Sequence, residues 1–187
     1  MLETQAKKIF DQAQKNFEEK NYTKAQKLWL EILDYYPKNL SVLKNLALAF
    51  YHDGSLEDSE VILKKIIEIN KREPNSLVML ILILEKQDKI NETKKYIDFG
   101  LKENILDKHW EIKKKLILPT IFENLKDIDE SRIELLQYIQ EILDSNKKIS
   151  LDIETQLIKP VQFDLSYNQY DNLEINKKCV NFFRKIY

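Results

Sequence analysis

The sequence contains few of the residues that interrupt helices or cross-link a chain. Its 187 residues include two glycines, four prolines and one cysteine. The scarcity of glycine and proline argues against a sheet with many tight turns and favours long helices joined by short turns. The single cysteine, Cys179, excludes an internal disulfide, so we expect a protein of a reducing compartment, with the cytoplasm as the default localisation.

The chain also lacks long apolar runs and an excess of charge of either sign. Its longest apolar run, Leu77–Leu84, is far shorter than the ~20 residues that cross a bilayer, and its polar N-terminus lacks the apolar core of a secretion signal. Lys and Arg number 30 against 31 Asp and Glu, and the balance holds in both halves of the chain. Nucleic-acid binding usually requires a concentrated basic face. We therefore expect neither a membrane nor a nucleic acid as partner.

What the chain does have is a repeat with an offset of 34 residues. A small or β-hydroxyl residue recurs at Ala25, Ser59 and Thr93, where two helices must come close together. Larger apolar residues recur around these positions, in three series: Tyr22, Leu56 and Ile90; Trp29, Leu63 and Ile97; and Leu33, Ile67 and Leu101. This pattern predicts pairs of packed antiparallel helices.

The period and these residues resemble the tetratricopeptide repeat (TPR), whose unit is a helix, a turn and a helix. The match is best around Leu46, Ala47, Phe50, Gly54 and Ser59. The resemblance implies an all-α fold, a TPR α-solenoid of three helix pairs over residues 1–104, with repeats at about 6–39, 40–73 and 74–104. We expect turns at Asn21, at Asp53 and Gly54, and at Asp88, the last in a position where glycine is common.

In this family the first helix of each repeat lines a concave groove that binds a peptide or a partner protein. Carried over position by position, the groove would comprise Phe10, Gln14 and Phe17 from the first repeat; Lys44, Leu48, Tyr51 and His52 from the second; and Val78, Leu82, Glu85 and Lys86 from the third. The alternative is that Phe17, Leu48 and Leu82 simply pack between helices.

Two specialised grooves of the family are not supported by the sequence. The positions that grip a peptide C-terminal carboxylate hold Phe10, Gln14, Asn45, Asn75 and Met79, of which only Asn45 fits. The asparagine ladder of O-linked N-acetylglucosamine transferases would fall on Asp11, Asn45 and Met79, and again only Asn45 fits.

Residues 105–187 lose the period and are expected to be an irregular helical segment with two short extended strips, which covers the end of the solenoid. The first strip is the proline-interrupted stretch 116–122. Amphipathic helices are expected at 127–143, opened by a capping box of Asp127 and Glu130, and after Asp171, opened in the same way with Glu174. Asp127, Ile128 and Arg132, and further on Phe163, Leu165, Tyr167 and Asp171, resemble the linker before the catalytic domain of bacterial SPINDLY-like and O-linked N-acetylglucosamine transferase-like proteins.

That resemblance implies a nucleotide-sugar transferase domain, fused or associated, and none is found in this chain. Gly54 and Gly100, the only glycines, both lie in the repeats and supply no glycine-rich phosphate loop. We expect the chain itself not to be an enzyme and to hold no cofactor. His52 and His109 lack a second ligand at helical spacing, so no metal site is predicted. Cys179, on an apolar helix face, is expected to be an inert buried thiol.

The sequence therefore predicts a protein-protein interaction module whose groove recruits a substrate or partner for a SPINDLY-like glycosyltransferase. The alternative is a free-standing TPR scaffold or adaptor unrelated to glycosylation. A catalytic domain encoded beyond residue 187 would favour the first interpretation, and a stop codon would favour the second.

Overall fold

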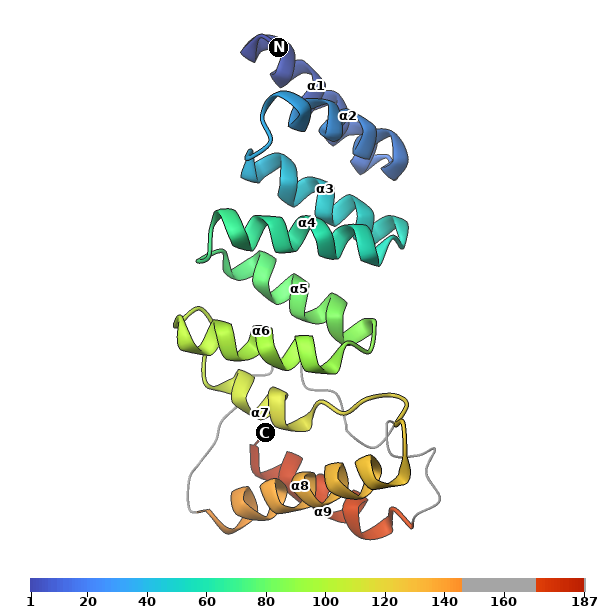
Figure 1. Ribbon diagram of the computed structural model, residues 1–187, viewed down its shortest axis with the longest axis vertical. Helices are drawn as coiled ribbons and strands as arrows, with labels where there is room; N and C mark the ends of the chain where they lie inside the picture. Colours follow the sequence, from blue (N-terminus) through green and yellow to red (C-terminus); the bar gives the residue numbers. More distant parts are fainter. Residues whose placement is uncertain (146–170, 187) are drawn as a thin grey trace. The chain divides into compact units, whose positions relative to one another are not determined.

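The computed structural model describes residues 1–145 and 171–186, and the regular structure in these residues is entirely α-helical (Figure 1). The chain divides into two compact units, Met1–Gln87 and Asp88–Tyr187. The N-terminal unit contains α1 (Glu3–Glu18), α2 (Tyr22–Tyr35), α3 (Leu40–Asp53), α4 (Leu56–Ile69) and α5 (Pro74–Lys86). The C-terminal unit contains α6 (Ile90–Lys102), α7 (His109–Leu116), α8 (Leu125–Asp144) and α9 (Leu173–Ile186).

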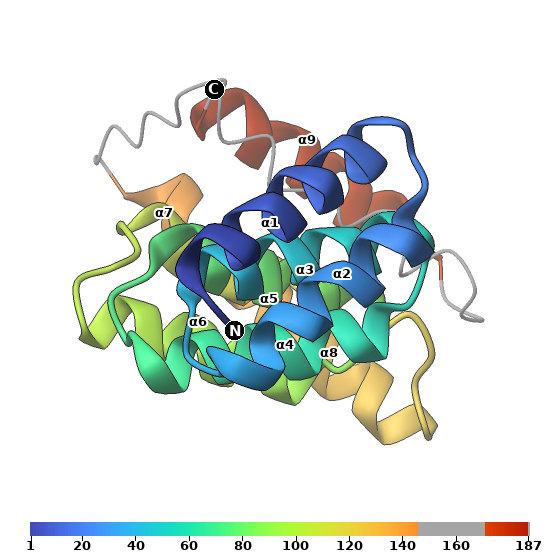
Figure 2. The same ribbon diagram turned by 90° about the horizontal axis from the view of Figure 1, so that it is seen from above.

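The N-terminal unit is an α-solenoid in which each helix packs on the next, from α1 to α5 (Figures 1 and 2). The starts of α2 and α4, at Tyr22 and Leu56, are 34 residues apart, as are the starts of α3 and α5, at Leu40 and Pro74. The 34-residue helix-turn-helix period read from the sequence is thus the period of the fold, and the predicted fold class is confirmed.

The division between the two units falls inside the third predicted repeat, between α5 and α6. The sequence places the boundary after residue 104 instead. Within the units, α5 packs on α4, and α6 packs on α7. The pairing of α5 with α6 as a third repeat, and the boundary at residue 104, stay predictions.

The small residues of the repeat lie in the helix contacts, as expected. Ala25 and Ser59 of the N-terminal unit are fully buried, together with the larger Trp29 and Leu63. The Ser59 hydroxyl donates a hydrogen bond to the carbonyl oxygen of Ala47 on the facing helix. In the C-terminal unit Thr93 is fully buried too, but its hydroxyl bonds to the carbonyl of Lys89 one turn back in its own helix. The hydroxyl group at this repeat position therefore finds its hydrogen-bond acceptor in two different ways.

The conformation of a turn residue between consecutive helices also recurs with the period. Lys20, Gly54 and Asp88 have positive φ angles of 62°, 88° and 59° and lie 34 residues apart. Glycine adopts this left-handed conformation without a steric penalty, whereas Lys and Asp do not. The first turn thus depends on Lys20 rather than on Asn21, which is the N-cap residue of α2. Asp88 adopts the conformation of the glycine that it replaces, and its carboxylate accepts a hydrogen bond of 2.8 Å from the backbone N–H of Thr120.

The C-terminal unit has its own core where α7, α8 and α9 pack in succession. Its buried side chains are Ile112, Leu116, Leu118, Leu135, Ile139, Ile175, Cys179, Phe182 and Ile186. The end of α8 is satisfied by α9, because the Lys185 ammonium donates to the Leu143 carbonyl at 2.7 Å and also to that of Ser145. Within this unit α7 packs on α6, and the expected covering of the end of the solenoid by the segment after residue 104 stays a prediction.

Two features of the predicted helix starts need correction. The N-cap of α8 is Asn124, whose side-chain oxygen accepts from the Asp127 N–H at 3.0 Å, so the predicted box opened by Asp127 is wrong. Asparagine is as good an N-cap as aspartate and here begins the helix a turn earlier. Before α9, the Asp171 carboxylate accepts at 2.8 Å from the N–H of Leu173, the first residue of the helix, whereas the predicted box requires the N–H of Glu174.

The first predicted strip is non-helical from Ile117 onward, while Leu116 still ends α7, and it pairs with no strand among the described residues. The backbone at Ile117 is extended, and Ile117 and Leu118 are buried while Ile121 is 80% exposed. The second strip, with Phe163, Leu165 and Tyr167, lies outside the described residues.

Candidate functional site

The predicted groove residues all lie on α1, α3 and α5, within the N-terminal unit. None of them is fully buried. Tyr51 and Leu82 are each 37% exposed, and His52 and Lys86 are exposed as well. The remaining groove residues, Phe10, Gln14, Phe17, Lys44, Leu48, Val78 and Glu85, are half-buried. These side chains are therefore accessible to a partner, while binding itself stays a prediction.

Facing side chains of α3 and α5 enclose a hollow of about 320 Å³, which we call the central hollow. Leu48 and Tyr51 line it from α3, and Asn75, Val78, Met79 and Leu82 line it from α5. Four of these six residues belong to the groove predicted from the sequence. In the sequence, Asn75 and Met79 fall on positions of a carboxylate clamp, and Met79 also on a position of the asparagine ladder, and neither residue fits. Both contribute to the wall of the central hollow instead.

An aromatic cluster lies where α1 ends, α2 begins and α3 ends. The ring of Phe17 lies 5.5 Å from that of Tyr22, 5.8 Å from that of Trp29 and 5.7 Å from that of His52. His52 stacks on Tyr22 with the ring centroids 5.6 Å apart, and the Tyr51 ring meets His52 at the same distance. The cluster thus connects three predicted groove residues, while Tyr22 and Trp29 entered the sequence argument only as repeat positions.

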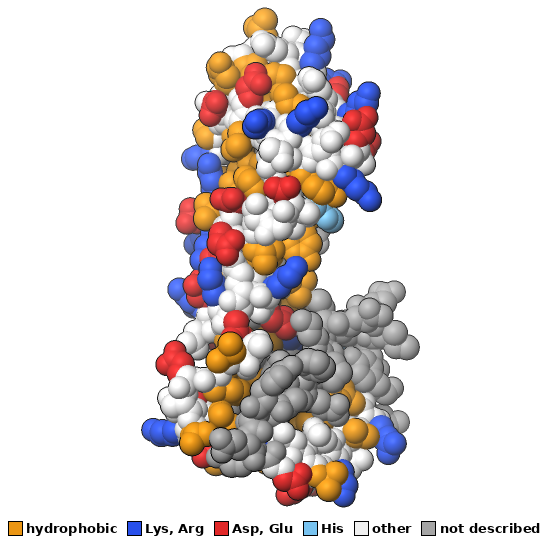
Figure 3. Space-filling model, turned by 90° about the vertical axis from the view of Figure 1, so that its right-hand side faces the viewer, with side chains coloured by type: hydrophobic (Ala, Val, Ile, Leu, Met, Phe, Trp, Pro, Cys, Tyr) orange, Lys and Arg blue, Asp and Glu red, His pale blue; other side chains and the backbone are white. Residues whose placement is uncertain are grey.

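The polar groups of the groove are partly engaged with one another. Lys44 forms an ion pair of 2.8 Å with Glu73, and the Gln14 amide donates to Glu18 at 3.2 Å. The Lys86 ammonium lies over the Tyr51 ring, 5.4 Å from its centroid, in cation–π geometry. On the face shown in Figure 3, acidic, basic and hydrophobic side chains of this unit are intermixed.

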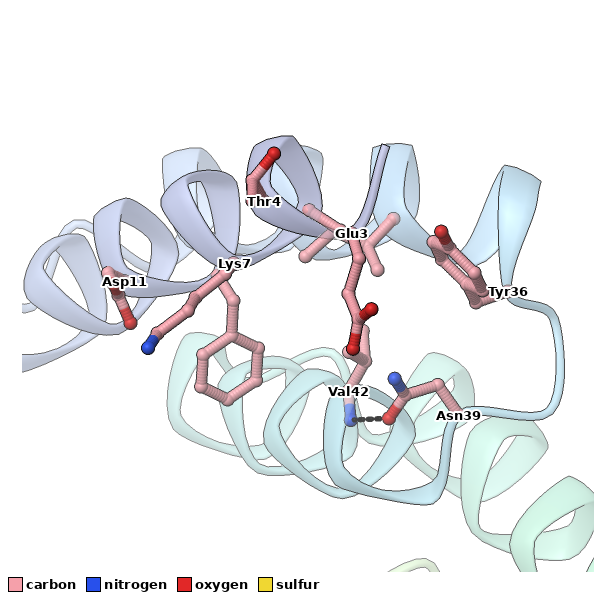
Figure 4. A pocket seen from close by; sticks show the side chains of 10 residues that line it. Glu3, Thr4, Lys7, Asp11, Tyr36, Asn39 and Val42 are labelled. Carbon is pink, nitrogen blue, oxygen red and sulfur yellow. Dashed lines mark hydrogen bonds between the residues drawn. The ribbon is translucent and has the colours of Figure 1, made fainter. Parts of the chain in front are cut away.

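A second and larger cavity, of about 860 Å³, lies between α1, the end of α2 and the start of α3 (Figure 4). We call it the N-terminal pocket. Its apolar lining consists of Ala6, Phe10, Ile32 and Val42, and its polar lining consists of Glu3, Thr4, Lys7, Asp11, Tyr36 and Asn39. Only Phe10 was predicted as a site residue. Ile32 and Tyr36 could not be found from first-helix positions, because Ile32 belongs to the second helix α2 and Tyr36 directly follows it.

Three titratable groups of the C-terminal unit have perturbed pKa values. Burial raises the pKa of the Cys179 thiol to about 11. Burial also raises the pKa of Tyr138 to about 12, with Glu111 and Glu141 adding to the shift. The pKa of Lys94 is lowered by burial, and Glu134 opposes this shift while Lys114 and Lys115 add to it. A thiol with a raised pKa is a poor nucleophile at neutral pH.

Two further observations concern other classes of site. Among the described residues, no group of three His, Cys, Asp or Glu side chains is arranged to hold a metal ion. Within the same residues, no helix combines the length and the apolar character needed to span a membrane.

Comparisons with known proteins give similarity of fold only. No protein-family model and no curated protein matches the sequence. The chain is similar to the first TPR of Spaghetti (RPAP3) bound to the HSP90 peptide SRMEEVD, with a TM-score of 0.49, 16% identity, and coverage of 74% of this chain and 96% of the other. It is similar to the Sgt2 TPR domain from Aspergillus fumigatus, with a TM-score of 0.48, 14% identity, and coverage of 73% and 82%. Naa15/Naa10 bound to HypK-THB gives a TM-score of 0.40 and 17% identity over 74% of this chain, which spans 21% of the other.

Proposed function

We propose that the N-terminal unit binds a peptide segment of a partner protein on the face formed by α1, α3 and α5. The observation that carries the proposal is the central hollow, where apolar side chains of two successive first helices remain accessible around a cavity of about 320 Å³. Grooves lined by apolar side chains and open to solvent are a common form of binding site for peptide segments. Filling this cavity with apolar side chains of a partner would remove that surface from water.

The composition of the surface supports the same proposal. Aromatic side chains such as Tyr51 and the neighbouring His52 give a large contact area at low entropic cost, and aromatic residues are enriched in binding interfaces. The positions that would grip a terminal carboxylate hold Phe10, Gln14, Asn45, Asn75 and Met79, so contacts to the side chains of the peptide would dominate over contacts to its terminus.

A substitution in the central hollow tests the proposal. A displayed random peptide library would be selected on the whole chain, which carries a C-terminal tag. The affinity of the enriched peptides would then be measured by fluorescence anisotropy. Leu82→Asp places a charge in the hollow and should weaken binding at least tenfold. Val61, 64% exposed on α4, offers the matched control, and Val61→Asp should change nothing. Failure to enrich any peptide, or equal binding by both variants, would contradict the proposal.

We extend the proposal to the role of the C-terminal unit as the linker of a SPINDLY-like glycosyltransferase. Its support is the sequence resemblance together with one contact between matching segments. The Arg132 guanidinium, two turns into α8, donates to the Asp171 carbonyl at 3.3 Å and to the Asn172 side chain. The alternative is a free-standing TPR scaffold.

The encoding gene separates these two roles. A downstream reading frame with a glycine-rich two-lobed domain, whose product transfers a sugar from a nucleotide sugar to protein, would support the glycosyltransferase role. A stop codon directly after codon 187 would overturn it and favour the scaffold.

A further inference from the structure

The N-terminal pocket has an apolar floor and an open volume that the chain's own end does not fill. Ile32 and Val42 form the floor and are 2% and 1% exposed, while Phe10 is a half-buried wall. The nearest apolar side chain at the terminus, Leu2, is 75% exposed, and the preceding carbonyl, of Met1, accepts a hydrogen bond of 3.0 Å from the Tyr36 hydroxyl. A cavity of about 860 Å³ falls in the size range of ligand sites, roughly 300–1,000 Å³.

Charged side chains line one edge of the pocket at helical spacing. Glu3, Lys7 and Asp11 follow one another at intervals of four residues and therefore lie on one face of α1 (Figure 4). Within the described part of the chain, neither carboxylate forms an ion pair. This edge therefore carries two acidic groups around one basic group, which makes it net negative.

From these two observations we propose that the N-terminal pocket binds bulky apolar side chains of the partner segment, and that lysine or arginine residues flank these side chains in the partner's sequence. The proposal rests on the proposed function, since it assigns the part of the peptide that enters the pocket. Phe10, Ile32 and Val42 contact the apolar anchor, and Glu3 and Asp11 attract the flanking cation. An acidic peptide would meet two carboxylates and a single ammonium, that of Lys7, so the pocket selects against it.

The choice of a basic segment is tested with three synthetic peptides. Each is a fluorescein-labelled twelve-residue peptide with the same central Leu and Phe anchors, flanked by Lys, by Gln or by Glu. Binding to the whole chain, tagged at its C-terminus to leave the pocket unobstructed, is measured by anisotropy at low salt. The lysine-flanked peptide should bind tightest and the glutamate-flanked one weakest, with steps of roughly two- to fivefold, as expected for exposed charge pairs. Equal binding of the three peptides, or the reverse order, would overturn the proposal.

The location is tested with variants of α1. Ala6 lines the pocket, so Ala6→Trp should fill it and weaken the lysine-flanked peptide roughly tenfold or more, the loss expected when one large apolar side chain no longer becomes buried. Gln12 is exposed on the same helix outside the pocket, and Gln12→Trp is the control. The double change Glu3→Gln and Asp11→Asn leaves Lys7 as the charged group of this edge, so it should abolish or reverse the preference for lysine over glutamate flanks while the glutamine-flanked peptide binds as before.

These outcomes separate the further inference from the proposed function. Loss of binding in Leu82→Asp together with unchanged binding in Ala6→Trp would keep the groove and overturn the pocket as its anchoring site. A preference for basic flanks that persists in the double variant would overturn the role of Glu3 and Asp11. If library peptides bind but none of the three synthetic peptides does, the proposed recognition of an apolar anchor with flanking charges would be refuted. The proposed peptide binding by the groove would still be supported.

Discussion

The hydroxyl of Ser59 in α4 donates a hydrogen bond of 2.8 Å to the carbonyl oxygen of Ala47 in α3. Both residues are fully buried. Because both side chains are small, the two helix backbones come close enough for a side chain of one helix to reach the main chain of the other. This contact explains physically why a small residue recurs every 34 residues in the sequence.

Replacing Ser59 by a larger residue should destabilise the N-terminal unit. Ser59→Leu adds atoms where the helices touch, and overpacking of this kind typically costs about 1–3 kcal/mol. Ser59→Ala keeps the close approach and loses only the hydrogen bond, a loss of about 1 kcal/mol. Urea unfolding followed by circular dichroism would measure both free energies, and a leucine variant as stable as the alanine variant would contradict the packing argument.

The recurring left-handed turn residue gives a pair of opposite predictions. Gly54 has open space around it, so Gly54→Ala should destabilise by the cost of a non-glycine residue at positive φ, about 1–2 kcal/mol. Lys20 already bears this cost at φ 62°, so Lys20→Gly should raise the free energy of unfolding by up to about 1 kcal/mol. Thermal unfolding would show a lower Tm for the first variant and a higher Tm for the second. If both variants shifted Tm in the same direction, the shared turn conformation would not be the cause.

Phe17 and Tyr51, both predicted as groove residues, differ in their surroundings. Phe17 is half-buried against Trp29, which is fully excluded from solvent, whereas Tyr51 is 37% exposed. Phe17→Ala should therefore lower stability by about 1–3 kcal/mol as buried apolar area is lost. Tyr51→Ala should leave Tm nearly unchanged and weaken peptide binding. Anisotropy and thermal unfolding of both variants separate the two roles, and a large drop in Tm for Tyr51→Ala would mean that its ring belongs to the core.

The sequence predicted the helices well because their signals are local. The period of 34 and the small residues set the spacing of the helices, and α5 begins at Pro74, the residue at which the third predicted repeat begins. A turn at Asp88 was expected despite the missing glycine, and the structure shows how aspartate meets the requirement, by adopting positive φ and bonding to Thr120.

The site was predicted less completely, since cavities depend on packing between distant segments. The N-terminal pocket combines Phe10 of α1 with Ile32 of α2 and Val42 of α3, and no spacing in the sequence relates these three residues. The aromatic cluster likewise includes Tyr22, which reaches His52 only because α2 packs on α3. First-helix positions alone could therefore identify the central hollow but could not identify the pocket.

The end of α8 is expected to depend on a side chain of α9. Lys185 donates to the carbonyls of Leu143 and Ser145, which have no partner within their own helix. Lys185→Met keeps the aliphatic stem and should lower the stability of the C-terminal unit by about 1 kcal/mol, since the lysine is partly exposed. Lys177→Met, at an exposed position of α9, is the control. Equal unfolding midpoints for the two variants would exclude a capping role.

The burial of the Cys179 thiol predicts a loss of protein stability at alkaline pH and slow reaction of this thiol at neutral pH. Its pKa is raised by burial from 9.0 to about 11, so the folded state keeps the proton to higher pH than the unfolded state does. The resulting contribution to stability is complete below pH 9 and is lost as the pH rises toward 11. Tyr138, whose pKa is raised to about 12, acts in the same direction at still higher pH.

The urea unfolding midpoint should thus fall more between pH 8 and pH 10.5 for the parent protein than for the Cys179→Ala variant. Labelling with a disulfide reagent at pH 8 should be slow in the native protein and complete in urea. Rapid labelling of the native protein, or an equal fall in midpoint for both proteins, would show that the thiol is not buried in the core formed by α7, α8 and α9.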